Sequence, residues 1–302
     1  MSKESTTALK KPKKRICGRS QKIIKDSVQG YIYVDKIVCE KIIDTDIFQR
    51  LRRIEQTSMR CLYPAASHDR FIHSMGVYNL AKIALNTIEN NIVQNAERFG
   101  DIIPAPDLRE KIHFAFEMAA LLHDVGHAPF SHTLEKYYGT KKNLAKQLAD
   151  AVNTEGFSHD IEGKEKEANF HEYVSAWVTV KRFSTEITEL GGNPEFVARM
   201  IIGLFYTDKG SHQIDNCMVS LLLGEVIDAD GLEYTCRDVW ASGYHTSSYD
   251  LKRLISALHI RKEPSTNDYV VCFDSNVVNE IDNVMTVKDF QMKYVFNHHT
   301  VV

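Results

Sequence analysis

This chain of 302 residues has no apolar run long enough to cross a bilayer and no large excess of charge of either sign. The first absence predicts a protein without a membrane partner, and the sequence shows no secretory leader. The formal net charge of −3 argues against nucleic-acid binding by the whole molecule, while local basic patches stay compatible with it. We therefore expect a cytoplasmic protein.

Paired cysteines are also missing. The chain has six cysteines and none of them forms a CxxC pair. They are Cys17, Cys39, Cys61, Cys217, Cys236 and Cys272. Such scatter argues against a disulfide framework and against a cysteine zinc site, and it suits a reducing compartment.

What the chain does contain is helical periodicity in a composition, 43% hydrophobic and 25% charged, that is typical of a globular protein. Apolar residues at three- and four-residue spacing predict helices at 38–54, 71–87, 108–122, 170–183, 194–204, 218–237 and 250–258. Residues 30–34 and 270–273 predict short strands, and the polar segment 139–169 predicts an exposed excursion. The expected fold class is mainly α, a single helical bundle with small β elements.

The densest cluster of potential ligands lies at residues 121–132, directly after an apolar helical segment. His123 and Asp124 are adjacent and can give one metal ion a nitrogen and an oxygen donor. His127 follows four residues later, on the same face while the chain stays helical, and His132 closes the cluster. Polar groups at the end of a buried helix are costly unless something binds them, so this segment predicts a metal site.

Three further segments are similarly rich in side chains that can bind a metal or act in catalysis: 68–74, 169–172 and 228–238. In this order and spacing, the segments between 22 and 238 resemble the HD-domain phosphohydrolases, and among them the deoxynucleoside triphosphate (dNTP) triphosphohydrolases, which include the SAM-and-HD-domain enzymes. The resemblance implies metal ligands at His73, His123, Asp124 and Asp230. Such a nitrogen and oxygen donor set suits Mn, Fe, Zn, Co or Ni, and members of the family also use Mg.

The same resemblance implies that a metal-activated water attacks the α-phosphate, releasing deoxynucleoside and inorganic triphosphate. His127, His132 and His171 would line the pocket, contact the phosphate and supply the proton for the leaving oxygen, with Glu135 orienting His132. Four residues match substrate contacts in the family. Arg70 would hold phosphate, Gln56 and Asp238 the sugar, and Tyr234 would stack beside the sugar and disfavour a 2′-hydroxyl.

The chain departs from those relatives near the substrate. Gly231 stands where they carry a phosphate-binding lysine, and the loop after Gln56 lacks their glycine-rich run. Arg60, in that loop, offers one replacement for the missing charge. Phe296 and His299 stand where the relatives often have tyrosine and lysine.

These departures keep three functions open: a dNTP triphosphohydrolase, a phosphodiesterase or nuclease acting on nucleotides or single-stranded nucleic acid, and a non-catalytic nucleotide sensor or partner-dependent subunit. The leading hypothesis is the first. A lysine- and arginine-rich stretch at 10–15 would suit nucleic acid or a targeting receptor, although a disordered end explains it better.

We expect three parts: a disordered basic tail (1–21), an HD phosphohydrolase domain (22–260) and a short C-terminal strand and helix extension that closes the pocket (261–302). Four residues, Lys22, Asp44, Gln49 and Arg52, match positions that bind an activating guanine nucleotide in the SAM-and-HD-domain enzymes. A capped helix with a solvated charged face explains them equally well. Because the chain ends soon after the pocket-closing segment, we expect a dimer and a different activation scheme from that of those relatives.

Overall fold

The structure is a computed structural model that describes residues 21–99, 106–164, 167–224, 227–244 and 249–297. The predicted tail lies outside these residues, except for Gln21, where β1 begins. Among the described residues, no helix combines the length and the apolar content needed to cross a bilayer. The fold is mainly helical with two small two-stranded sheets, which confirms the predicted fold class.

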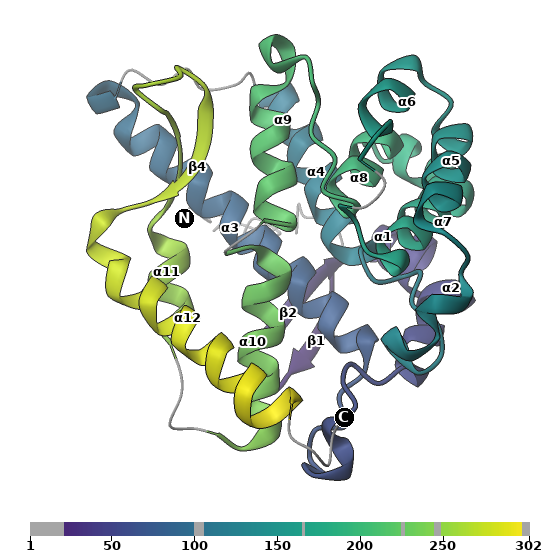
Figure 1. Cartoon of the computed structure of the whole chain (residues 1–302). Coiled ribbons are helices and arrows are strands. Elements are labelled where there is room, and N and C mark those ends of the chain that lie inside the picture. The colour runs from purple at the N-terminus through teal and green to yellow at the C-terminus, as the bar shows by residue number, and fades with distance from the viewer. Residues whose placement is uncertain (1–20, 100–105, 165–166, 225–226, 245–248, 298–302) are drawn as a thin grey trace, which may run out of the picture.

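Long helices form the body of the molecule, and shorter elements join or flank them (Figure 1). The long helices are α3 (Arg70–Phe99), α4 (Pro106–Leu122), α5 (Lys141–Val152), α7 (Phe170–Glu189), α9 (Lys209–Leu222), α10 (Ala229–Ser242) and α12 (Val278–Gln291). The shorter helices are α1 (Lys36–Val38), α2 (Asp46–Gln49), α6 (Glu155–Ile161), α8 (Pro194–Ile201) and α11 (Leu251–Ser256). The strands are β1 (Gln21–Asp26), β2 (Gly30–Asp35), β3 (Leu258–Lys262) and β4 (Tyr269–Phe273).

The core is built around α3 and α4, which pack against each other and carry the strongest apolar runs. In α4, every side chain from Met118 to Leu122 is fully buried, because α3, α7, α8 and α9 surround this helix. The hairpin β1–β2 is antiparallel and buries Ile32 and Val34 of β2 in the same core. The antiparallel pair β3–β4 packs its first strand against α3, so the predicted boundary at 260/261 falls within β3.

The predicted exposed excursion at 139–169 is wrong. Most of it forms α5 and α6, each begun by a threonine that caps the helix, and α5 packs against α7. Leu148 and Phe157 are fully buried there, although most of their neighbours are polar. A narrow apolar stripe on a polar helix is sufficient to dock it, and the bulk polarity of the segment hid that stripe.

Two helical predictions need a smaller correction. The predicted helix 218–237 is two helices, α9 and α10, because Asp228 ends the connection and accepts a hydrogen bond from the backbone of Gly231 as the N-cap of α10. Residues 38–54 are helical but divided into short turns, with Thr45 capping α2 after a wider turn at Cys39–Ile43 and a tighter one following at Arg50–Arg53. The remaining predicted helices and strands are present with modest shifts of their ends.

Candidate functional site

The four predicted metal ligands converge from three helices. His73 lies in the first turn of α3, His123 and Asp124 follow the end of α4, and Asp230 is the second residue of α10. Asp230 Oδ1 lies 2.9 Å from His73 Nε2 and 3.5 Å from His123 Nε2. Asp124 Oδ2 lies 3.7 Å and 3.6 Å from the same two ring nitrogens. Tertiary folding therefore places one donor atom from each side chain around a common centre.

The spacing of these donor atoms fits a bound cation. Metal–ligand bonds of about 2.1 Å place neighbouring donors about 3.0–3.4 Å apart, close to the distances found here. The Nε2 atoms of His73 and His123 face each other at 3.2 Å. Because the Nδ1 atoms of both rings already have acceptors, the rings in their neutral forms would point two lone pairs at each other. Asp230 Oδ1 is buried and has no hydrogen-bond partner among the described residues, which adds a third lone pair at this point.

The electrostatics of the cluster favour positive charge. Burial opposes protonation of His73, but Asp230 and Glu233 outweigh it and raise the pKa of His73 to about 10. Burial likewise disfavours charge on Asp230, but His123 and His73 hold the pKa of this carboxyl well below its usual range. The same attraction that would hold a proton here would hold a divalent cation, so the donor set fits a metal.

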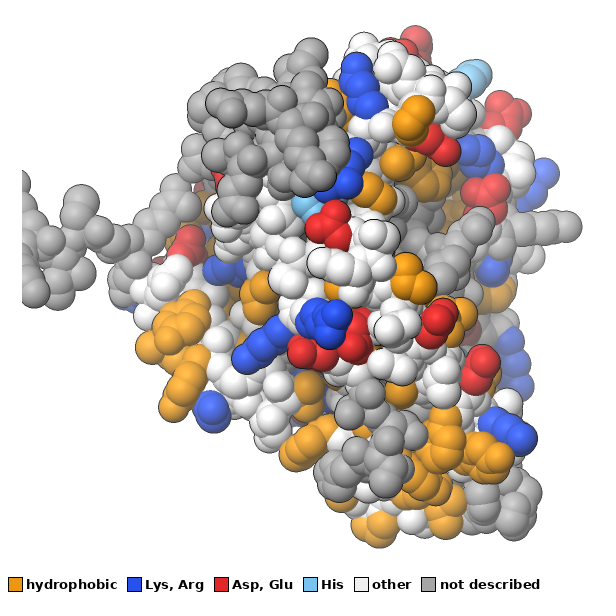
Figure 2. Space-filling model, turned by 90° about the vertical axis from the view of Figure 1, so that its left-hand side faces the viewer, with side chains coloured by type: hydrophobic (Ala, Val, Ile, Leu, Met, Phe, Trp, Pro, Cys, Tyr) orange, Lys and Arg blue, Asp and Glu red, His pale blue; other side chains and the backbone are white. Residues whose placement is uncertain are grey.

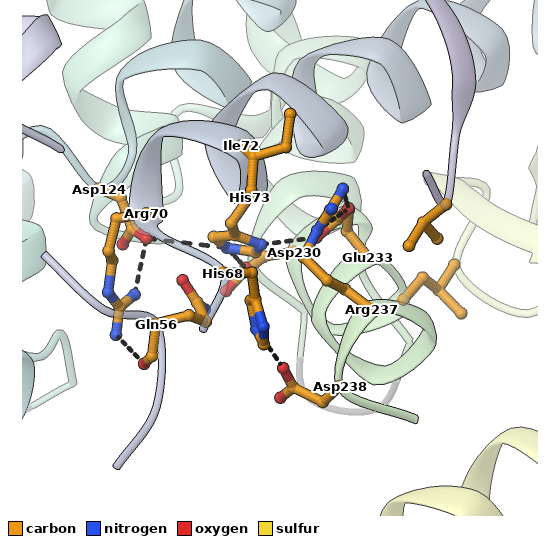
Figure 3. Close-up of polar contacts among 12 residues, drawn as sticks. Gln56, His68, Arg70, Ile72, His73, Asp124, Asp230, Glu233, Arg237 and Asp238 are labelled. Carbon is orange, nitrogen blue, oxygen red and sulfur yellow. Dashed lines mark hydrogen bonds and ion pairs between the residues drawn. The ribbon is translucent and has the colours of Figure 1, made fainter. Parts of the chain in front are cut away.

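Three of the four predicted ligands, His73, His123 and Asp124, are fixed by a second contact. His73 Nδ1 lies 2.7 Å from Glu233 Oε2, and His123 Nδ1 donates to the carbonyl oxygen of Ala120 at 2.8 Å. Arg70 Nη1 donates to Asp124 Oδ2 at 2.6 Å (Figure 3). Outer contacts of this kind set the orientation and tautomer of metal-binding histidines. Sequence analysis gave no role to Glu233, although it follows Asp230 by three residues and so shares its face of α10.

The three predicted catalytic histidines form a second cluster around Glu135. Glu135 Oε1 lies 2.7 Å from His132 Nδ1 and 2.6 Å from His171 Nδ1. The ring of His127 stacks on that of His171, with centroids 4.0 Å apart, and its Nε2 lies 3.2 Å from Asp124 Oδ1. The structure thus brings all four residues together beside the metal ligands, and Glu135 contacts His171 as well as the predicted His132.

Protonation differs across this second cluster. Burial chiefly lowers the pKa of His127 to about 3, so this ring is neutral near pH 7. Burial alone would raise the pKa of Glu135, but hydrogen bonding with His171 and His132 outweighs it and lowers that pKa to about 2. A carboxylate fixed in the ionised form between two imidazoles can hold both Nδ1–H groups, which leaves each Nε2 for exchange with a ligand.

Local backbone contacts explain why the turn after α4 reaches this cluster. A Cβ atom on Gly126 would lie 2.3 Å from the backbone nitrogen of Ser175, so only glycine lets this turn press against α7. Arg50 donates to the carbonyl oxygens of His127 and Val125 and holds the turn from the other side. The next residues, Phe130 and Ser131, have positive φ angles of 64° and 53°, and the Oγ of Ser131 accepts from Arg70.

Both clusters open onto one cavity of about 1020 Å³. Eight of the predicted site residues line it: Gln56, Arg70, Asp124, His132, His171, Asp230, Tyr234 and Asp238. The other four, His73, His123, His127 and Glu135, lie behind this lining and contact it. The predicted ligand, catalytic and substrate residues are therefore all represented in one cavity wall or lie directly behind it.

The sugar-side wall contains a pair that sequence analysis did not identify. His68 Nε2 lies 2.7 Å from Asp238 Oδ1, and both side chains are buried (Figure 3). Gln56 Oε1 is buried without a hydrogen-bond partner among the described residues. These groups offer a ligand hydroxyl one acceptor from Gln56 and one carboxylate held in place by His68.

The position left by Gly231 is filled from another helix. The Nζ of Lys288, on α12, lies 2.8 Å from the point where a Cβ atom of residue 231 would be, and it lies over the ring of Tyr234. Arg60 instead pairs with Glu55, which lines the cavity, and neither Arg60 nor Lys288 is itself a lining residue. A positive charge therefore lies beside Gly231 although this position carries none itself, and it comes from a residue 57 positions further along the chain.

Two predictions concern more distant parts of the chain. Met292 and Phe296, from the C-terminal segment, line the cavity, while His299 lies outside the described residues. The four residues matched to an activator site form two pairs: Lys22 with Asp44 at 2.7 Å, and Arg52 with Gln49 at 2.9 Å. Nucleotide activation stays a prediction.

The chain is similar in sequence to known proteins. The model of the HD domain family matches residues 70–233. The uncharacterized protein YwfO of Bacillus subtilis is 27% identical over 283 residues, 93% of this chain and 52% of its own length. The uncharacterized protein MJ1154 of Methanocaldococcus jannaschii is 30% identical over 243 residues, 78% of this chain and 38% of its own length.

The chain is also similar to a named enzyme, the deoxynucleoside triphosphate triphosphohydrolase SAMHD1 of Gallus gallus. The identity is 27% over 268 residues, which cover 86% of this chain and 40% of that protein. The chain thus spans about half, or less, of the length of these three relatives. Since the family match covers more than half of the chain and includes all four predicted ligands, the chain belongs to the HD domain family of metal-dependent phosphohydrolases.

Proposed function

We propose that this protein hydrolyses deoxynucleoside triphosphates to deoxynucleoside and inorganic triphosphate, with a divalent metal held by His73, His123, Asp124 and Asp230. The observation that carries the proposal is the single cavity that Asp124 and Asp230, His132 and His171, and the sugar-side groups Gln56, Tyr234 and Asp238 all line. The similarity to SAMHD1 of Gallus gallus, a named triphosphohydrolase, supports the same substrate class.

When bound, the metal would neutralise charge on the attacked phosphate and activate water, and Mn, Fe, Mg, Zn, Co and Ni all suit the donor set. Arg70 would orient the phosphate, since its guanidinium already spans Asp124 and Ser131 at the cavity wall. Lys288, on α12, would bind the outer phosphates of the substrate. A preorganised cationic wall of this kind stabilises charge that develops on phosphate oxygens.

The histidine cluster would move the proton that the leaving oxygen needs. Glu135 holds the Nδ1 atoms of His132 and His171, so the transferred proton is carried at Nε2. His132 is the more exposed of the two rings, which places it where a substrate can reach it. Neutral His127, stacked on His171, would contact the phosphate without competing for the proton.

Gln56, Tyr234 and Asp238 would hold the sugar. The buried Asp238 accepts from a sugar hydroxyl while His68 fixes its second contact. The ring of Tyr234 fills the space beside the sugar, which disfavours an added 2′-hydroxyl. We also propose that residues 261–302 close the cavity through Met292 and Phe296, and that the protein acts in the cytoplasm as a dimer.

A product assay tests this function. The wild-type protein is incubated with each of the four dNTPs, with Mn²⁺ or Mg²⁺, and with EDTA as the matched control. The expected result is inorganic triphosphate by ion-exchange chromatography, lost with EDTA. Metal-loaded protein that releases no triphosphate from any dNTP overturns the proposal. Cleavage of a labelled single-stranded oligonucleotide or a cyclic dinucleotide in parallel samples would instead identify a nuclease or phosphodiesterase, and nucleotide binding without turnover a sensor.

A further inference from the structure

A chain of buried polar contacts connects the β1–β2 hairpin with metal ligand His73. Glu233 Oε2 contacts His73 Nδ1 at 2.7 Å, and the other oxygen of this carboxylate accepts from Arg237 Nε at 2.9 Å. Arg237 Nη1 donates in turn to Asp26 Oδ1 at 3.0 Å. Figure 3 shows Glu233 between His73 and Arg237. Three elements, β1, α10 and α3, are thereby joined through charged side chains.

The hairpin end of this chain is itself fixed. Asp26 is the last residue of β1, and its Oδ2 accepts from the backbone nitrogens of Val28 and Gln29 in the hairpin turn. Asp26 therefore accepts from the turn through Oδ2 alone, whereas both of its carboxylate oxygens accept from Arg237. A displacement of the turn would move the acceptor on which the Arg237 guanidinium depends.

Burial makes this chain more than a surface ion pair. Asp26, Arg237, Glu233 and His73 expose 3%, 2%, 0% and 1% of their surfaces. Two carboxylates and one guanidinium leave one negative charge, and Glu233 faces the ligand. Buried ion pairs of this kind commonly add little to stability compared with apolar side chains of similar volume. Their placement at a metal ligand suggests a contribution to that ligand's orientation.

A glycine makes room for the contact. Gly76 lies one turn after His73 on α3, and a Cβ atom there would lie 2.1 Å from Glu233 Oε1 and 2.8 Å from Arg237 Nη2. Any other residue at 76 would push the carboxylate away from His73. The sequence of α3 therefore provides both the ligand and the space for the group that orients it.

We propose that Asp26, Arg237 and Glu233 are positioning residues that hold His73 in its metal-binding tautomer, so that the β1–β2 hairpin contributes to metal affinity. Glu233 accepts the proton on His73 Nδ1, which leaves the Nε2 lone pair facing the other ligands. Arg237 fixes the Glu233 carboxylate, and Asp26 fixes Arg237. This inference rests on the metal centre of the proposed function but not on the identity of the substrate.

Metal affinity of the full chain tests the inference. Glu233→Gln keeps the shape of the side chain and removes its charge, and Gly76→Ala displaces the carboxylate while all charges stay. We expect both to weaken Mn²⁺ binding, measured by competition with a chelating dye, by about 10- to 100-fold. Asp26→Asn, two contacts further away, should weaken it less. The visible spectrum of bound Co²⁺ should shift in Glu233→Gln, because its ligand geometry changes.

Matched controls separate positioning from general damage. Asp35→Asn removes a carboxylate of the β1–β2 hairpin that takes no part in the contacts linking Asp26, Arg237, Glu233 and His73. Gly156→Ala adds a methyl group to α6 at a point where no atom lies within 4 Å. Both should bind Mn²⁺ like the wild type. Unchanged affinity and Co²⁺ spectrum in Glu233→Gln and Gly76→Ala, or equal losses in Asp26→Asn and Asp35→Asn, would overturn the inference. If Glu233→Gln fails to fold by circular dichroism, Gly76→Ala and Asp26→Asn decide.

The outcome is independent of the reaction. A wild-type protein that binds metal but releases no triphosphate would defeat the proposed function and leave the positioning chain intact. Normal triphosphate release together with unchanged Mn²⁺ affinity in Glu233→Gln would defeat only the positioning chain.

Discussion

The metal end and the substrate end of the cavity are built in different ways. At the metal end, each predicted ligand lies within the first turn of a helix or just after a helix end, and His73, His123 and Asp124 each have a buried second contact. At the substrate end, Gln56 lies in a loop, Tyr234 and Asp238 lie on α10, and Met292 and Phe296 come from the segment after α12. The predicted ligands are thus all placed by helix ends, whereas the predicted substrate wall combines a loop, a helix and the C-terminal segment.

Figure 2 shows one outer face of the molecule. Its hydrophobic side chains lie in separate groups with acidic and basic side chains between them. The charged side chains that pair with one another at the metal end are buried instead, and burial strengthens their electrostatic interactions. The most informative substitutions are therefore those that affect one end of the cavity and leave the other intact.

The largest expected effect is at the metal end. Asp124→Ala removes a ligand and leaves Arg70 without its buried partner, so we expect metal binding and triphosphate release to be lost. Metal analysis by mass spectrometry and the chromatographic product assay measure the two losses. Asp150→Ala, an exposed carboxylate on α5, is the matched control. Full activity in Asp124→Ala would place the chemistry elsewhere.

The second effect is on proton transfer. Glu135→Gln should lower kcat by about 100-fold or more, because His132 and His171 lose the carboxylate that fixes their Nδ1 atoms. Bound metal should be retained, as measured by metal analysis. Exposed Glu155→Gln is the control, and an unaltered kcat in Glu135→Gln would exclude this proton path.

The same substitution has a predicted pH signature. The pKa of Glu135 is lowered to about 2 in the folded chain, below its value of 4.5 in the absence of these contacts. Its stabilising contribution is therefore complete above pH 4.5 and is lost as the pH falls toward 2. Chemical denaturation of the metal-free proteins should show a steeper loss of unfolding free energy below pH 4.5 in the wild type than in Glu135→Gln. Parallel curves would contradict the assigned pairing.

The third effect is confined to the substrate end. Lys288→Ala should raise KM by about 10- to 100-fold, since a hydrogen bond to a charged group contributes about 1.5–3 kcal/mol. Metal affinity should stay as in the wild type. Lys293→Ala, an exposed lysine just after α12, is the control. Recovery of KM on adding Gly231→Lys to Lys288→Ala would show that one positive charge at this point is required, from either segment.

The smallest effect on activity is expected far from the cavity, in the helices that sequence analysis predicted as an exposed excursion. Leu148→Ala should lower the free energy of unfolding by about 2–5 kcal/mol, because its side chain is fully buried. Its kcat should stay within about twofold of the wild type, as expected for a change that leaves the cavity wall intact. Exposed Lys146→Ala should change neither quantity. A marginal loss of stability would instead support the sequence-based prediction that this segment is exposed.

The segment 121–132 could be predicted as a metal site from local sequence, whereas the ligand roles of His73 and Asp230 and the role of His171 came from the family resemblance. His123 and Asp124 are adjacent, and His132 precedes Glu135 by three residues, so each pair meets with little help from the rest of the chain. The strongly periodic helices around them were predicted for the same reason: a long apolar stripe must be buried. Where the stripe was narrow, as around Leu148, bulk polarity concealed it.

What the tertiary structure alone decided is which distant groups complete these motifs. Glu233 reaches His73 only because α10 crosses α3 at Gly76, and Lys288 replaces the charge missing at Gly231 only because α12 packs over α10. Such contacts depend on the docking of whole helices, which follows from the burial of apolar surface over the entire chain and leaves no signature at the two residues that meet. The sequence by itself determined the residue types of the predicted metal site, and the packing of the helices determined which groups surround them.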